Sequence, residues 1–299
     1  MPLRGIIKDC SILPNVALNM ALKNGESEVT MTKSKNGATG TQLLDRAVAM
    51  LKILGEAGQA GARTLDLGEQ LNLTAPTTHR IIAALERHGL VEREASTRRY
   101  RLGLALFSLG ARAADGTGLR TIARPSLIKL AAETGDTVFL MARSGLNVVC
   151  VDRQEGTYFL DSLTGHVGGQ IPMGVGSASQ ALLAFLPAAE AQAIIDANES
   201  AYGRFGKLTA KSVLEQLPAI RERGCAVDHG DLVEGISAIA VPVLTPGRDV
   251  VAAFAINMTS SRLSADRIET LTSLLKDEVS KISAALNPME YAARNRRPF

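Results

Sequence analysis

The stretch LTAPTTHRIIAALERHGLVEREASTRRYRLG, residues 73–103, decides the fold of the N-terminal part of this chain. Ile81, Ile82 and Leu85 follow helical spacing, and Pro76 stands where the first turn of a helix tolerates a residue without a backbone N–H. The pattern predicts a helix that ends near His88. Four of its residues are expected to face outward in part or in full: Thr77, Thr78, Arg80 and Ala84.

Further helices and a hairpin flank this helix in the sequence. Residues 90–94 and 98–103 predict two short strands about the turn Ala95-Ser96-Thr97. Upstream, a first helix is expected from Thr41, and Thr64 is expected to cap a short second helix. The first helix is expected to form one apolar face from Leu43, Leu44, Ala47, Val48, Leu51 and Leu54. Three helices followed by a hairpin predict a winged helix-turn-helix over residues 41–103.

Positive charge is concentrated in the same stretch. Residues 72–103 hold six arginines and three glutamates, a local charge of +3 that equals the net charge of the whole chain. The major groove of DNA admits one α-helix, whose first residues reach base edges while nearby basic groups neutralise phosphates. The pattern therefore predicts binding to double-stranded DNA. The expected contacts are Pro76, Thr77, Thr78, His79 and Arg80 in the helix and Arg98, Arg99 and Arg101 in the hairpin.

Each of these arginines, taken alone, has a solvated surface position as its alternative. Tyr100, between the hairpin arginines, is expected to pack on its own domain rather than on a base.

The composition sets the broad class of protein. With 299 residues, of which 46% are hydrophobic, the chain is long enough for two globular domains. Its three cysteines, Cys10, Cys150 and Cys225, form no CxxC pair, which favours a reducing cytoplasm over a disulfide framework. We expect no signal peptide and no membrane span. Residues 1–40 predict a flexible tail, and Met31 is an alternative start to Met1.

The second part of the chain predicts helices packed on an antiparallel sheet, an α+β arrangement. A helical connector interrupted by Gly110 and by Gly116 to Gly118 precedes a helix at residues 121–134. Hairpins are expected about Ser144-Gly145-Leu146-Asn147 and Pro246-Gly247, with a helix broken at Pro187 between them. Ser264 begins a final helix whose apolar side carries Ile268, Leu271, Leu275, Val279, Ile282 and Leu286.

Few residues in this second part are suited to catalysis. Cys225 and His229 could form a nucleophile and base, but they lie in a segment expected to be a strand entering a loop, where residues i and i+4 need not converge. Buried structural cysteines are the favoured alternative for Cys225 and Cys150. His166, His229 and Cys225 lack metal-ligand spacing. We therefore expect no catalytic residue, no metal and no cofactor.

Binding is better supported than catalysis. The segment IPMGVGSASQALLAF sets a Gly- and Ser-rich turn before a helix, which would present backbone N–H groups and a positive dipole end to a small anion. Simple helix capping by Gly174, Gly176 and Ser177 is an equal alternative from the residues alone.

Three segments resemble the isocitrate lyase regulator (IclR) family of bacterial transcription factors: LLDRAVAMLKIL, TTHRIIAALERHGLVER with YRLG, and ALLAFLP with GCAVDHGDLVEGISAIAVPV. The resemblance covers about residues 41–287. It implies a winged helix-turn-helix, a linker helix at residues 104–120, and an effector-binding domain of GAF/PAS-like α/β fold at residues 121–288, followed by a tail at 289–299. It also implies homodimers or homotetramers on operator DNA and a ligand-responsive regulator rather than an enzyme.

The same resemblance implies the effector-binding residues, which are Ser177, Ala178, Asp228, Ala238, Ala255 and Asn257. The family's Gly-Lys-Ala is here Ser179-Gln180-Ala181, and the alanines at 238 and 255 replace polar side chains. The implied effector is therefore a small organic acid, with a larger or more apolar aromatic acid favoured by these departures. An enzyme or ligand-binding domain that retains a degenerate winged helix is the alternative function.

Overall fold

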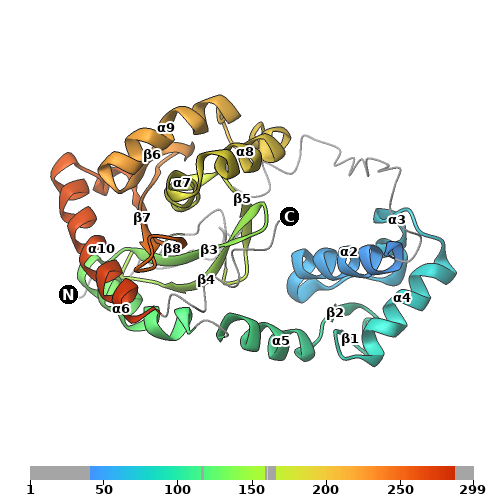
Figure 1. The fold of residues 1–299 in the computed structure, drawn as a ribbon. Helices are drawn as coiled ribbons and strands as arrows, with labels where there is room; N and C mark the ends of the chain where they lie inside the picture. The colour runs from blue at the N-terminus through green and yellow to red at the C-terminus, as the bar shows by residue number, and fades with distance from the viewer. Residues whose placement is uncertain (1–40, 116–117, 159, 161–165, 287–299) are drawn as a thin grey trace, which may run out of the picture. The chain divides into compact units, whose positions relative to one another are not determined.

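The structure, a computed structural model, describes residues 41–115, 118–158, 160 and 166–286. The expectations for the tails at 1–40 and 289–299, including Cys10 and Met31, lie outside these residues. The chain divides between Leu106 and Phe107 into two compact units. Figure 1 shows the elements of both units.

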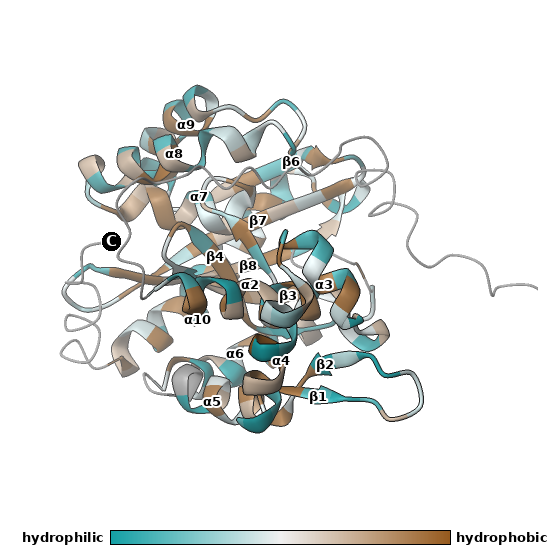
Figure 2. Cartoon of the chain, turned by 90° about the vertical axis from the view of Figure 1, so that its right-hand side faces the viewer, coloured by the Kyte–Doolittle hydropathy of each residue, from teal (hydrophilic) through white to brown (hydrophobic). Residues whose placement is uncertain are grey.

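The first unit confirms the winged helix-turn-helix. Its helices are α2 (Gln42–Ala57), α3 (Thr64–Gln70) and α4 (Ala75–Arg87), with a short 3-10 turn η1 (Gly58–Ala60) after the first. Strands β1 (Val91–Arg93) and β2 (Tyr100–Leu102) pair antiparallel as the wing. Much of the hairpin formed by the two strands is hydrophilic in Figure 2. The core of this unit consists of Met50, Leu54, Ala62, Leu67, Ile81, Ile82, Leu85, Val91 and Tyr100.

Two local expectations for this unit are wrong. Thr64 does not precede α3 as its cap, because Arg63 holds that position and donates its backbone N–H to the Asp66 carboxylate at 3.0 Å. The apolar face expected for helix α2 is also only partly buried. It buries Met50 and Leu54 and leaves other apolar side chains exposed, namely Leu43, Leu44 and Val48.

Helix α5 (Leu104–Asp115) follows the wing. The expected interruption at Gly110 is wrong, because Gly110 lies inside this continuous helix. The next helix, α6 (Leu119–Thr134), begins two residues earlier than expected. None of the helices in the described ranges is long and apolar enough to cross a membrane.

The second unit contains a six-stranded antiparallel sheet in the order β5-β4-β3-β8-β7-β6. Both predicted hairpins are confirmed, as β3 (Thr137–Ser144) with β4 (Asn147–Gln154) and β7 (Ile236–Leu244) with β8 (Val250–Thr259). The edges are β5 (Gln170–Pro172) and β6 (Ala226–Val233). The helices are α7 (Gly176–Phe185), α8 (Ala188–Tyr202), α9 (Ala210–Arg223) and α10 (Ala265–Ala285), with a 3-10 turn η2 (Ser260–Arg262) before the last.

Helices cover both faces of this sheet (Figure 1). Alternate strand residues divide between two apolar clusters, because side chains in a strand point to opposite faces in turn. Phe139, Ala240 and Ala255 pack with α7, α8 and α9, whereas Leu140, Ile239 and Phe254 pack with α6 and α10. Helix α10 buries Leu271, Leu275, Val279 and Ile282 in the second cluster. Its apolar side is therefore used within the unit.

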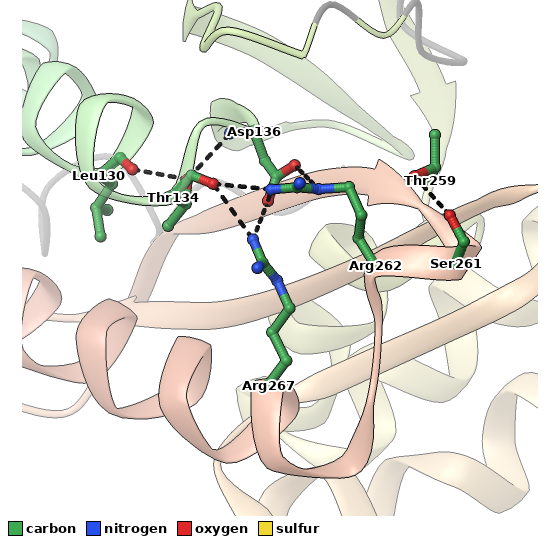
Figure 3. Close-up of polar contacts among 7 residues, drawn as sticks. All are labelled: Leu130, Thr134, Asp136, Thr259, Ser261, Arg262 and Arg267. Carbon is green, nitrogen blue, oxygen red and sulfur yellow. Dashed lines mark hydrogen bonds and ion pairs between the residues drawn. The ribbon is translucent and has the colours of Figure 1, made fainter.

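Two buried carboxylates fix α10 in place. Asp136, fully buried, accepts from Arg262 Nε at 2.9 Å and from Arg267 Nη2 at 2.6 Å, and the Thr134 carbonyl accepts from both arginines (Figure 3). Glu278 accepts from Ser126, Lys129 and Lys281 at 2.6–2.8 Å.

Candidate DNA-binding and effector-binding sites

The first turn of α4 presents the candidate base-reading surface. Thr74 precedes the helix in an extended conformation, and Pro76 occupies the first turn as expected. Pro76, His79 and Arg80 are exposed, and Thr77 is partly buried with its hydroxyl 2.9 Å from that of Thr74. The structure thus leaves four of the five predicted helix positions accessible to a partner.

The fifth position, Thr78, was expected to contact DNA, and this expectation is wrong. Its side chain is fully buried, and its hydroxyl donates to the Thr74 carbonyl at 3.1 Å. Thr78 lies three and four residues before Ile81 and Ile82 and therefore shares their core-facing side of the helix. It faces Gly68 of α3, where an added Cβ would lie 3.1 Å from the Thr78 hydroxyl oxygen. Thr78 thus sets the packing of α3 on α4 and does not reach a base.

A groove of about 310 Å³ runs between α3 and α4 beside this contact. It is lined by Thr64, Leu65, Gly68, Glu69, Asn72, Leu73, Ala75, Thr78 and His79. The close approach of the two helices at Gly68 therefore shapes the surface from which His79 and the start of α4 project.

The wing arginines differ from one another in the structure. Arg99 donates to the Gly61 carbonyl at 2.9 Å, and Arg101 pairs with Glu94 at 2.9 Å, so both hold the wing together. Hydrogen bonds from Thr97 and Arg101 lower the pKa of Glu94, which keeps this pair charged. Arg98 is exposed at the turn with φ +57° and has no side-chain partner in the described part of the chain. Arg98 is therefore the wing residue most available to a phosphate.

Tyr100 behaves as expected. It is 7% exposed, belongs to the core of the unit, and its backbone N–H and carbonyl pair with Ala62.

In the second unit, three of the predicted effector residues form one row across the sheet. Asp228 on β6 lies opposite Ala238 on β7, and Ala238 lies opposite Asn257 on β8. The row continues to Thr137, which lies opposite Asn257 on β3. Each of the four lies two residues along its strand from a member of the α7 cluster, and therefore faces the same, α7 side of the sheet.

Thr137 was missed by the sequence reasoning. Its strand position is visible in the sequence, but its place in the row depends on the pairing of β3 with β8, which no local pattern reveals.

The glycine-rich turn before α7 has a fixed structure. Gly174 has φ +103°, and a side chain there would collide with Tyr202, whose hydroxyl donates to the Met173 carbonyl at 2.7 Å. The Gly174 N–H donates to Ser179 Oγ at 2.6 Å, and the Gln180 amide donates to the Gly174 carbonyl at 3.2 Å. Ser179 and Gln180, where the family has Gly-Lys, thus stabilise the turn from inside the helix.

The start of α7 keeps its own N–H groups free of a side-chain cap, because Val175 precedes the helix. Ser177 and Ala178 are 4% and 8% exposed, and Ala178 packs in the same apolar cluster as Ala255. Ala178 is therefore a tightly packed residue of this wall rather than the floor of an open cleft.

Asp228 does not stand free in the row. Its Oδ1 accepts from the backbone N–H groups of Gly230 and Asp231, both at 3.0 Å. Burial raises the pKa of Asp228, and these two hydrogen bonds partly offset the increase. The carboxylate therefore shapes the β6 bulge that follows it, which fits a positioning role.

Cys225 and His229 do not form a catalytic pair. Cys225 is buried in the cluster beneath α10, where Thr272 Oγ1 lies 3.7 Å from its sulfur, and His229 is exposed. His166 is also exposed. Burial raises the pKa of Cys150 to about 12, so this thiol is inert as a nucleophile. Within the described ranges, no three His, Cys, Asp or Glu side chains are grouped to hold a metal ion.

Comparison with known proteins agrees with this architecture. Residues 43–95 match the IclR helix-turn-helix domain, and residues 111–284 match the C-terminal domain of bacterial IclR transcriptional regulators. The regulator KipR of Bacillus subtilis is 32% identical over 224 residues, which is 74% of this chain and 89% of KipR. The repressor AllR of Escherichia coli K12 is 28% identical over 250 residues, 83% of this chain and 91% of AllR.

Solved structures share the fold. An IclR transcriptional regulator from Alicyclobacillus acidocaldarius has a TM-score of 0.69 at 28% identity, covering 81% of this chain and 97% of its own. An IclR homologue from Microbacterium hydrocarbonoxydans, solved with 4-hydroxybenzoate, has a TM-score of 0.67 at 21% identity, covering 81% of this chain and 98% of its own.

The winged helix, its exposed recognition surface and the separate α/β domain define a DNA-binding regulator. The chain belongs to the IclR family of bacterial transcriptional regulators.

Proposed function

We propose that this protein binds an operator through α4 and the wing and that it responds to a small organic acid in its second unit. The observation that carries the proposal is the exposed set Pro76, His79 and Arg80 at the start of α4, with Arg98 free at the wing. Polar side chains at the start of a recognition helix can read base edges, as His79 and Arg80 would, and an exposed arginine such as Arg98 can neutralise a phosphate. Since bacterial DNA lies in the cytoplasm, the protein acts there.

The two units have different proposed functions. We assign DNA binding to residues 41–103, the connection to residues 104–120, and effector binding to residues 121–288. The effector site is the α7 side of the row formed by Asp228, Ala238, Asn257 and Thr137, closed by Ser177, Ala178 and Ala255. The helix start offers N–H donors to a carboxylate, and the complex of the Microbacterium homologue with 4-hydroxybenzoate supports an aromatic acid as one candidate.

The active form is a homodimer or homotetramer. Helix α2 exposes Leu44 at 65% and Val48 at 41%, and helix α5 exposes Leu104 and Phe107, each at 72%. Exposed apolar side chains on successive turns mark contact surfaces, and a second copy of the chain would cover them. Two recognition helices would then read the two half-sites of a palindromic operator.

The protein acts as a regulator and not as an enzyme. The Asp228 carboxylate of the candidate site is held in hydrogen bonds to the backbone that follows it, and the thiols of Cys150 and Cys225 are buried.

The test is DNA binding by the full chain. A duplex carrying the native upstream region is titrated at several salt concentrations, beside a duplex of scrambled sequence. Several phosphate contacts should make log K fall against log[salt] with a slope of about −0.9 for each contact, and the native duplex should bind more tightly. Binding that ignores both salt and sequence would contradict the proposal.

A further inference from the structure

Helix α4 ends in a turn that fixes the direction of the chain after it. The Gly89 N–H donates to the Glu86 carbonyl at 2.8 Å, and the Leu90 N–H donates to the Leu85 carbonyl at 3.0 Å. These two bonds form a Schellman motif, in which the residue after the helix cap takes a left-handed conformation, and Gly89 has φ +66°. Strand β1, which follows directly, enters the core of the first unit. The turn is therefore fixed relative to α4.

Helix α5 begins against this same turn. The first N–H groups of a helix have no partner within the helix and need acceptors from elsewhere. The Gly103 N–H donates to the Leu90 carbonyl at 2.9 Å, and the Ala105 N–H donates to the Gly89 carbonyl at 3.3 Å. A Cβ at position 103 would lie 2.2 Å from the Gly89 carbonyl oxygen, so a glycine is required for this approach. The start of α5 is thus bound to the end of α4, although the wing separates them in the sequence.

A side chain from the wing completes this α4–α5 junction, which consists of residues 89–92 and 103–105. Glu92 lies on β1, and its Oε1 accepts the N–H of Leu104, the first residue of α5, at 3.2 Å. A carboxylate at the start of a helix satisfies an unpaired N–H and interacts favourably with the positive end of the helix dipole. The other two acceptors of the junction are backbone carbonyls, so the Glu92 contact is the one of the three that depends on a side chain.

The charge of Glu92 is unfavourable for a wing that is proposed to bind DNA. The residue is exposed, and it lies opposite Arg101 in the hairpin, but Arg101 forms its ion pair with Glu94. Phosphates repel a negative charge on a DNA-binding face, so such a charge weakens binding unless it contributes in another way. The cap on α5 is a contribution of this kind.

We propose that Glu92 is a positioning residue for operator binding. By capping α5 it makes α4 and α5 one rigid body, so that the two copies in a homodimer hold their α4 helices at the separation of the two half-sites. This inference rests on the proposed function, because it requires a second copy of the chain bound along α5. Leu104, whose N–H is capped, is 72% exposed and belongs to the apolar residues that this second copy would cover.

The experiment compares Glu92→Ala with Glu92→Gln in the full chain. Both variants lose the charge, but the glutamine oxygen can still accept the Leu104 N–H. The operator is mapped by footprinting on the native upstream duplex, and affinities are measured for this operator and for a duplex with one half-site. On the operator, Glu92→Ala should bind about five-fold more weakly than Glu92→Gln, the factor expected for the loss of one helix cap. On the single half-site the two variants should bind equally.

The separation of the half-sites supplies a readout that a purely structural role would not change. Two base pairs added between the half-sites turn one half-site by about one fifth of a helical turn relative to the other. The wild type and Glu92→Gln, with a rigid junction, should lose much of their affinity for this longer operator. Glu92→Ala should lose less, because its loosened junction can adjust.

Hydrogen exchange without DNA tests the cap itself. The Leu104 amide should exchange faster in Glu92→Ala than in the wild type and in Glu92→Gln, because its N–H no longer has an acceptor.

Four results would overturn the inference: equal operator affinities of the two variants, an equal loss by Glu92→Ala on the operator and on the half-site, the same sensitivity of both variants to the added base pairs, or unchanged exchange of the Leu104 amide. Binding by the wild type separates these failures from that of the proposed function. If the wild type prefers the native duplex to the scrambled one and the variants behave alike, only the role of Glu92 is wrong. If the wild type shows no such preference, the proposed function is wrong and the role of Glu92 is wrong with it.

Discussion

Asp136 and Thr137 are consecutive, fully buried residues whose side chains serve opposite faces of the same sheet. Asp136 bonds to Arg262 of η2 and Arg267 of α10, on the side covered by α6 and α10. Thr137 points to the side covered by α7, where the candidate effector site lies. A single step along the chain thus joins a structural anchor to a proposed ligand contact. A shift of β3 in register would disturb both, because it would exchange the faces of the two side chains.

Replacing the anchor should lower stability strongly. In Asp136→Asn the two arginines lose their buried counter-charge, and the free energy of unfolding should fall by about 3–5 kcal/mol. Denaturant unfolding measures the loss. The control is Glu215→Gln, which removes an exposed ion pair with Lys211 and should change stability by less than about 0.5 kcal/mol. Equal effects of the two substitutions would show that the Asp136 cluster does not anchor α10.

Glu278 should make stability depend on pH in the acid range. Burial alone would raise its pKa, but hydrogen bonds from Lys129, Lys281 and Ser126 outweigh burial and lower the pKa to about 2. Because the folded pKa lies below the ordinary value of 4.5, the stabilisation is complete above pH 4.5 and is lost as pH falls toward 2. The difference between the two pKa values corresponds to roughly 3 kcal/mol in the free energy of unfolding.

Unfolding of Glu278→Gln measured from pH 6 to pH 2 tests this dependence. The variant should have a lower free energy of unfolding than the wild type at pH 6. The difference between the two free energies should become smaller as the pH falls. Glu133→Gln serves as the control. Glu133 is 42% exposed, and its Oε1 lies 3.7 Å from Nζ of the same Lys129. A gap that stays constant across this range would refute the assignment.

The sequence predicts well those elements whose signals are local. The two sheet hairpins follow from their turn residues, and the start of α10 follows from Ser264, whose side chain accepts from the Arg267 N–H. Burial that depends on a neighbouring element is harder to foresee. Thr78 was expected to face outward in part, yet the absence of a side chain at Gly68 brings α3 against it.

The candidate effector site shows the same limit. The residues 228, 238 and 257 were carried over from a family resemblance, and the structure places them side by side. Thr137 joins them only because β3 pairs with β8, more than a hundred residues away along the chain.

Gly68 and Thr78 should be energetically coupled. Alanine is about 0.8–1 kcal/mol more favourable than glycine inside a helix, but a Cβ at position 68 would lie 3.1 Å from the Thr78 hydroxyl oxygen. Gly68→Ala alone should therefore gain less than this amount, or lose stability. In the Thr78→Ala background the full gain should appear. A double-mutant cycle in urea measures the coupling, and strictly additive effects would show that α3 and α4 are not in tight contact here.

Arg80 and Arg98 should affect DNA binding in different ways. Arg80 is exposed on the first turns of α4, where side chains reach base edges, so Arg80→Ala should cost about 1–3 kcal/mol on the operator and little on random DNA. Arg98 is exposed at the wing, so Arg98→Ala should weaken both duplexes alike and reduce the salt slope by about one. Fluorescence anisotropy with both duplexes at three salt concentrations separates the two effects. Arg223→Ala, an exposed arginine of the second unit, is the control and should leave both affinities unchanged. A uniform loss for Arg80→Ala across the two duplexes would show that α4 holds the DNA backbone without reading its sequence.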